Sequence, residues 1–96
     1  MQESTFRTLA DAELARIEQW LEDEYPDLDT AWAADGVLNV ETGSGETVII
    51  NRHAAAQEIW IAARCGGFHF RHAEAGWHDT RDQMPLQARL AAILAG

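Results

Sequence analysis

Apolar residues at the start of the chain recur with the period of an α-helix. Spacings of four, four, three and four residues place them on one face of a helix with about 3.6 residues per turn. Ser4 or Thr5 can serve as the N-cap, and the Tyr25-Pro26 step stops the helix, because proline pushes the preceding residue out of the helical conformation. The predicted apolar stripe is Phe6, Ala10, Leu14, Ile17 and Leu21.

From Asp35 onward the pattern changes to a period of two, which is typical of β-strands. The loops at residues 42–46 and 65–67 are short and contain glycine, so the strands that they join must be antiparallel neighbours. The predicted strands are Val37–Glu41, Thr47–Asn51, Glu58–Arg64 and Gly67–His72, with Trp77–Arg81 as a short fifth strand.

In each strand one alternate set of side chains is more apolar than the other, and we expect this set to face the helices. A closing helix starts with Pro85 as its first residue. The pattern predicts one domain over residues 1–96: an α+β two-layer sandwich with two helices on one face of an antiparallel sheet of about five or six strands. The inward strand residues are Leu38, Val40, Val48, Ile50, Ile59, Ile61, Phe68 and Phe70, and the closing helix adds Leu86, Leu90, Ile93 and Leu94.

The other face of the predicted sheet has no remaining segment to cover it. An exposed tryptophan on such a face, Trp60, favours a docking anchor for a partner protein. The alternative is that Trp60 packs across the strands against Ile49 or the stem of Arg71. Alternation places Thr47, Ile49, Asn51, Trp60, Ala62, His69 and Arg71 on this open face.

The charge balance narrows the class of partner. Sixteen acids against seven arginines and no lysine give a formal net charge of -9, which argues against nucleic acid and anionic membranes and favours cations or a basic protein surface. The only cysteine, Cys65, excludes an internal disulfide and a cysteine-based zinc site. We expect a soluble cytoplasmic protein, because no signal peptide and no apolar run of about 18 residues is present.

The acids are distributed unevenly along the chain. Between Arg16 and Arg52 there is no positive side chain but there are nine acids, six of them between Glu18 and Asp29. These six surround the end of the first helix, where the helix dipole disfavours negative charge, so we expect a cation to bind there. Exposed oxygen ligands suit hard cations and predict weak, poorly selective binding. The alternative is a solvated acidic face that aids solubility.

The remaining reactive groups form no catalytic pattern. His69 and His72 are three residues apart in a strand and therefore point to opposite faces. His78 lies in the last predicted strand and His53 in a loop, so we interpret all four histidines as surface residues. There is no phosphate-binding glycine loop and no serine nucleophile motif. We therefore expect a protein that is not an enzyme.

Four segments occur in a fixed order: Asp35–Val40, Val48–Arg52, Glu58–Ala62 and Gly66–Phe70. Together they resemble the core signature of the frataxin family, in its bacterial CyaY branch, and the similarity covers nearly the whole chain. The resemblance implies a frataxin-like sandwich that binds iron weakly and docks on the cysteine desulfurase of iron-sulfur cluster assembly. There it would supply iron, regulate the rate, or both. The cluster scaffold protein is a further partner on the same grounds.

The resemblance also implies roles for individual residues. It places a metal-binding acidic ridge on the first helix and first strand, and partner contacts on that ridge and on the open sheet. The implied metal-binding residues are Glu18, Glu22, Asp23, Asp27, Asp29, Asp35 and Glu41. The implied partner-binding residues are Glu22, Asp23, Asn51 and Trp60.

The chain departs from the family pattern at three places. His53 replaces a glutamine at a partner contact, Arg7 replaces a histidine near the start of the first helix, and Asp82-Gln83 replaces Ser-Gly before the last helix. We expect the last change to alter the turn but not the function. Two alternatives to a monomeric adaptor stay open: a ferroxidase that oxidises iron on the ridge, and an iron store that forms by iron-induced oligomerisation.

Overall fold

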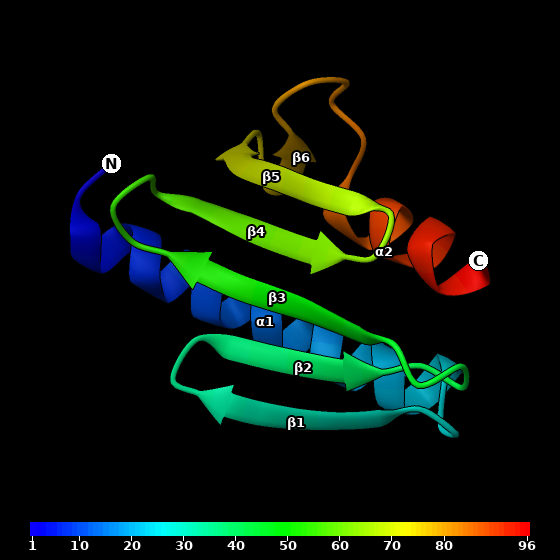
Figure 1. Ribbon diagram of the computed structural model, residues 1–96. Helices are drawn as coiled ribbons and strands as arrows, with labels where there is room; N and C mark the ends of the chain where they lie inside the picture. Colours follow the sequence, from blue (N-terminus) through cyan, green and yellow to red (C-terminus); the bar gives the residue numbers. More distant parts are fainter.

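The chain forms one helix, six strands and a second helix, in that order (Figure 1). The structure is a computed structural model that describes residues 1–96. Strands that follow one another in the chain are neighbours in the sheet, and every pair is antiparallel. The elements are α1 (Glu3–Glu24), β1 (Asp29–Ala34), β2 (Val37–Glu41), β3 (Thr47–His53), β4 (Glu58–Ala63), β5 (Gly66–Ala73), β6 (Gly76–Asp79) and α2 (Leu86–Ala95).

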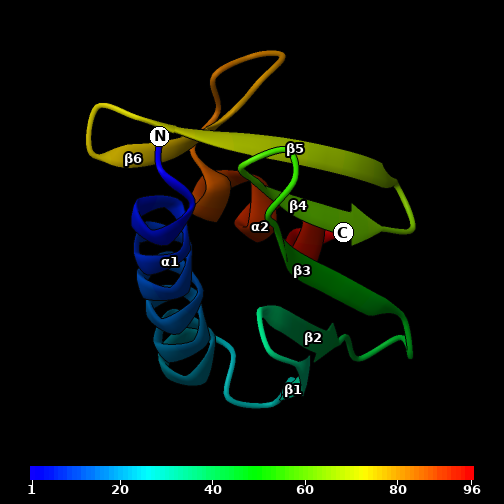
Figure 2. The same cartoon turned by 90° about the vertical axis from the view of Figure 1, so that its left-hand side faces the viewer.

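Both helices lie on the same face of the sheet and leave the other face open (Figure 1 and Figure 2). A core of 15 buried apolar residues fills the space between the two layers. The predicted α+β two-layer sandwich is therefore confirmed. The core residues are Phe6, Ala10, Leu14, Ile17, Leu21, Leu38, Val40, Val48, Ile50, Ile59, Ile61, Phe70, Trp77, Leu86 and Leu90.

The predicted apolar faces are confirmed, with differences only at their margins. The whole first stripe is buried, and so is the inward set of the strands apart from Phe68, which is half-buried. In α2, Leu86 and Leu90 are buried, whereas Ile93 and Leu94 are only partly covered and pack against the edge of the core. Neither helix combines the length and the apolar character that a membrane span requires.

Three local predictions are wrong. Helix α2 begins at Leu86, and Pro85 is its N-cap, with an extended backbone, and not its first residue. Helix α1 begins at Glu3, and Gln2 is its N-cap without any side-chain capping bond, so neither Ser4 nor Thr5 caps it. The helix starts earlier because the backbone N–H of Phe6 already reaches the Gln2 carbonyl, at 2.9 Å. In addition, the histidine at position 53 is the last residue of β3 and not part of a loop.

Strand β1 is the one element that the hydrophobic pattern does not predict. It is an edge strand whose side chains are mostly exposed on both faces, so burial imposes no alternation on its sequence. Three of its six residues are alanines, which have a low strand propensity. Pairing with β2 holds it in place, from Asp29 opposite Glu41 to Ala34 opposite Val37, with a bulge after Trp32.

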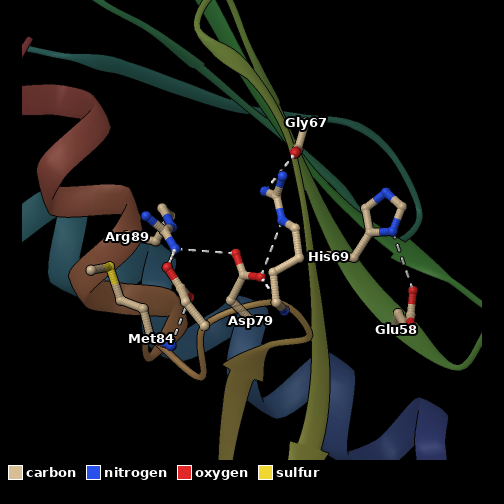
Figure 3. Close-up of polar contacts among 8 residues, drawn as sticks. Glu58, Gly67, His69, Asp79, Met84 and Arg89 are labelled. Carbon is tan, nitrogen blue, oxygen red and sulfur yellow. Dashed lines mark hydrogen bonds and ion pairs between the residues drawn. The ribbon is translucent and has the colours of Figure 1, made fainter.

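Strand β6 ends in a buried ion-pair network that shapes the segment leading to α2 (Figure 3). The carboxylate of Asp79 is fully buried and accepts hydrogen bonds from the backbone N–H of Arg81, at 2.8 Å, and from the guanidinium of Arg89, at 3.3 Å. Asp82 accepts a bond from the backbone N–H of Met84, at 3.0 Å, and also pairs with Arg89. The departure from the family pattern at Asp82 therefore contributes to the turn.

Candidate functional site

Six of the seven predicted metal-binding acids lie at one end of the molecule. The end of α1, the start of β1 and the end of β2 meet there (Figure 1). Most of these side chains are exposed, and Glu18, which is half-buried, accepts a hydrogen bond at 2.9 Å from the indole N–H of Trp32 in β1. We call these six residues the acidic ridge: Glu18, Glu22, Asp23, Asp27, Asp29 and Glu41.

The acidic ridge holds like charges close together. Glu18 and Glu22 are one helical turn apart on α1, and Asp29 of β1 lies directly opposite Glu41 of β2. Two carboxylates about 6 Å apart repel by roughly 0.7 kcal/mol at the dielectric constant of water and by about 3 kcal/mol at an effective value near 20. No basic residue occupies the last turn of α1 to relieve this repulsion. A bound cation would reverse the sign of this interaction.

Ion pairs neutralise most of the acids elsewhere in the molecule but none of those on the ridge. All seven arginines form salt bridges, and these involve seven of the sixteen acids, which leaves nine acids unpaired. Seven of those nine lie between Glu18 and Glu41: the six ridge residues and Glu24. The other two, Glu3 and Glu74, lie outside this segment.

Asp35, the seventh predicted ligand, does not belong to this cluster. It lies in the turn between β1 and β2, at the opposite end of β1 from Asp29, and pairs with Arg7 at 2.7 Å and Arg52 at 2.9 Å. The hydrogen bond and the charge of Arg52 lower the pKa of the Asp35 carboxyl below its usual value, and the charge of Arg7 adds to this effect. The expectation that the acids between Arg16 and Arg52 lack counter-charges is therefore wrong at this position.

Gly36 makes room for this pairing. Its φ angle is +76°, and a Cβ at this position would lie 2.7 Å from Cζ of Arg52. The backbone N–H of Arg52 also donates to the Gly36 carbonyl at 2.8 Å. Glycine is thus needed both for the backbone conformation and for the close approach of the guanidinium to Asp35.

On the open face, Trp60 is clamped between two histidines and is not a bare side chain. The ring of His53 stacks on one side with centroids 3.7 Å apart, and that of His69 on the other side at 4.3 Å. His53 Nδ1 accepts a hydrogen bond from the backbone N–H of Ala56 at 3.1 Å, which fixes that ring. Trp60 therefore presents its edge to solvent. Its stacking partners are neither Ile49 nor the stem of Arg71, the two that the sequence suggested.

The buried carboxylate of Glu58, which lies next to this stack in β4, holds the stacked rings in position. It accepts hydrogen bonds from the Trp60 indole at 2.8 Å and from Arg71 at 2.5 Å. It also lies 3.7 Å from His69 Nδ1 (Figure 3). Burial raises the pKa of Glu58, but the hydrogen bonds from Trp60 and Arg71 outweigh it and bring the pKa below its usual value. The carboxylate therefore stays ionised at neutral pH and holds the indole in one orientation.

Apart from Asp35, the predicted site residues thus fall into two groups. The six ridge acids lie at one end of the molecule, and Asn51 and Trp60 lie opposite each other on β3 and β4 of the open face. No group of three or more histidine, cysteine, aspartate or glutamate side chains is arranged to hold a metal ion. The sequence pattern did not indicate a role for Glu58 or for the two stacking histidines. Alternation alone could have placed His69 beside Trp60, but not His53, which was assigned to a loop.

Comparisons with known proteins point to one family. A family model described as a frataxin-like domain matches residues 1–95. The iron-sulfur cluster assembly protein CyaY of Dechloromonas aromatica is 47% identical over 93 residues, which cover 97% of this chain and 89% of that protein. The protein of the same name from Ralstonia nicotianae is 42% identical over 96 residues. The alignment covers 97% of this chain and 85% of that protein.

Solved structures support the same assignment. Frataxin from Psychromonas ingrahamii superposes with a TM-score of 0.88 at 28% sequence identity, covering 96% of this chain and 87% of that one. Trimeric frataxin from the yeast Saccharomyces cerevisiae, complexed with ferrous iron, gives a TM-score of 0.72 at 24% identity, with coverages of 88% and 80%. The second likeness concerns the fold alone.

Proposed function

The chain belongs to the frataxin family, in its bacterial CyaY branch, and on that premise we propose that it is an iron-binding accessory protein of iron-sulfur cluster assembly. In this proposal it acts as a cytoplasmic monomer and is not an enzyme. It binds iron on the acidic ridge and docks on the cysteine desulfurase, as an iron supplier, a regulator of the rate, or both. Relatives that are 40 to 47% identical and named for this process support the assignment.

One observation carries the proposal: unpaired acids are concentrated on the ridge while every arginine is engaged elsewhere. Surface acids kept only for solubility would be expected to mix with the arginines, as Asp35 does with Arg7 and Arg52. A cluster of unneutralised carboxylates instead attracts cations and basic protein surfaces. Both proposed ligands of the ridge, iron and the desulfurase, are of this kind.

The chemistry of the ridge limits how iron can be held. Carboxylate oxygens prefer hard cations, so ferric iron, calcium, magnesium and manganese should compete on similar terms. Exposed ligands that do not converge on one point bind weakly and exchange their cargo readily. Such a surface suits a protein that transfers iron to a partner and does not store it.

The open face would orient the partner. Asn51 and the edge of Trp60 lie side by side on an uncovered sheet, and the histidine clamp holds the indole in a single position. A preorganised aromatic residue loses little conformational entropy on binding, which favours it as an interface anchor. In this arrangement the ridge supplies attraction and the sheet supplies orientation, towards the desulfurase and the cluster scaffold protein.

Reversing two ridge charges is expected to weaken binding of the cysteine desulfurase. The variant carries Glu22→Lys and Asp23→Lys. At physiological salt we expect about tenfold weaker binding or more, because the two introduced lysines would repel a basic surface. The measurement is binding by calorimetry together with a thermal melt to verify the fold. The matched control is Glu3→Lys with Glu74→Lys, which makes the same charge change at the two unpaired acids outside the ridge segment. Equal losses in the two variants would reject the ridge as an interface.

Ferrous iron is expected to stabilise the fold through the ridge. At 100 times its dissociation constant, a ligand specific for the folded state raises the free energy of unfolding by about 2.7 kcal/mol. Anaerobic thermal melts with and without iron measure this shift, which the Glu22 and Asp23 double variant should reduce and the Glu3 and Glu74 control should retain. Melting curves that do not respond to iron would contradict iron binding while leaving the docking proposal intact.

A further inference from the structure

The two edges of the sheet are treated differently by the fold. At the β6 edge, the segment that leads to α2 covers the strand: His78 forms a bridge with Pro85, and the backbone N–H of Asp79 donates to the Met84 carbonyl at 2.9 Å. At the other edge, β1 has β2 on one side and no protein element on the other (Figure 1). No turn, cap or side-chain hydrogen bond reaches the backbone of residues 30–34.

The uncovered strand has few of the features that prevent pairing with another chain. Its central segment, Thr30–Ala34, carries no charge, no proline and no bulky side chain except Trp32. Free edges in natural proteins are usually protected by lysine, proline, charged inward residues or coverage. The bulge between Trp32 and Ala34 is the only such device here. The strand thus offers about 17 Å of unpaired backbone to an added strand.

We propose that the β1 edge binds an extended, basic peptide segment of a partner protein by strand addition. Two acids that form no salt bridge, Asp27 and Asp29, precede the uncharged segment. Asp35 follows it but already pairs with Arg7 and Arg52. A groove between α1 and the end of β1 could receive alternate side chains of the added strand. The groove is lined by Asp11, Ala15, Trp32, Ala34, Asp35 and Gly36.

Charge selects this occupant over a second copy of the chain. Pairing of two β1 edges would bring together two molecules of formal charge -9 each, which repel one another. A basic segment instead gains attraction from the net negative charge and from Asp27 and Asp29 at the start of the edge. The inference needs only the edge and its flanking charges and does not depend on the proposed role in cluster assembly.

The test uses a short, end-blocked peptide in which arginine alternates with valine. We expect it to slow hydrogen exchange of the edge-facing amides within residues 30–34, measured by NMR on the full chain. A control peptide of the same sequence, N-methylated at every residue, keeps the charge and most side-chain contacts but cannot form a strand ladder. It should bind about tenfold more weakly or worse, because main-chain hydrogen bonds supply the affinity of strand addition.

Further arms separate the possible outcomes. Asp27→Asn with Asp29→Asn should weaken binding of the unmethylated peptide, and a peptide with glutamate in place of arginine should not bind. Equal affinity of the methylated and unmethylated peptides would overturn the proposal, because charge alone would then explain binding. Protection outside β1, or no binding, would overturn it as well. Concentration-dependent protection of residues 30–34 without peptide would identify a second copy as the occupant and overturn it too.

Discussion

Replacing Asp79 by alanine is expected to lower the free energy of unfolding by about 3 kcal/mol, near the lower end of the range for breaking a buried ion pair. The carboxylate has no solvent exposure, and its removal leaves the Arg89 guanidinium, whose side chain is only 18% exposed, with one partner fewer. The backbone N–H of Arg81 also loses its acceptor. For a domain of this size the melting temperature should fall by about 12 °C or more.

The control for this prediction lies in the same network. Asp82 also pairs with Arg89, but half of its side chain is exposed, so Asp82→Ala should cost about 1 kcal/mol or less. Chemical denaturation of the two variants measures both values. Combining Asp79→Leu with Arg89→Met should recover part of the loss, because no buried charge is then left unpaired. Similar small costs for Asp79→Ala and Asp82→Ala would show that burial does not strengthen this pair.

The layers of the fold could be predicted because an element that is buried on one side has apolar residues at a regular spacing. Leu14 and Ile17 face a sheet, and Ile50 and Ile61 face helices, so their spacings follow the geometry of each element. Strand β1 has no such regular spacing of apolar residues, because neither of its faces is fully covered. What places it is hydrogen bonding to β2, which any sequence compatible with an extended backbone can provide.

The acidic ridge was only partly predictable, because proximity in sequence is not proximity in space. The segment between Arg16 and Arg52 lacks positive residues, yet the fold brings both Arg7 and Arg52 to Asp35. Conversely, Asp29 and Glu41 are 12 residues apart in the chain but face each other across two strands. The register that places Asp29 opposite Glu41 requires β1, and β1 is the strand that the hydrophobic pattern did not predict.

The clamp on Trp60 depends on register in the same way. Alternation placed Trp60 and His69 on one face, but only the pairing of β4 with β5 sets them directly opposite each other. His53 joins them because β3 continues two residues beyond its predicted end. The position that departs from the family pattern thus acquires a role next to the proposed docking anchor.

Replacing Trp60 by alanine is expected to weaken desulfurase binding by about 2 kcal/mol or more, roughly 30-fold, the range of an aromatic hot spot. The indole edge is the part of the stack that a partner can reach, and it is held in position by the rings of His53 and His69 and by the bond to Glu58. Its loss removes the anchor and releases both histidines. Calorimetric titration of the desulfurase, below the melting temperature of the variant, measures the change.

Two further variants show whether the effect belongs to this surface. Trp32→Ala removes an exposed indole on the helix-facing side of β1, away from the open face, and should leave more of the affinity intact. His69→Ala keeps Trp60 but frees one face of it, so binding should weaken by a smaller factor, because the indole must then be ordered on docking. If Trp60→Ala and Trp32→Ala weaken binding equally, the open face has no special part in docking, and the ridge alone would account for attraction and orientation.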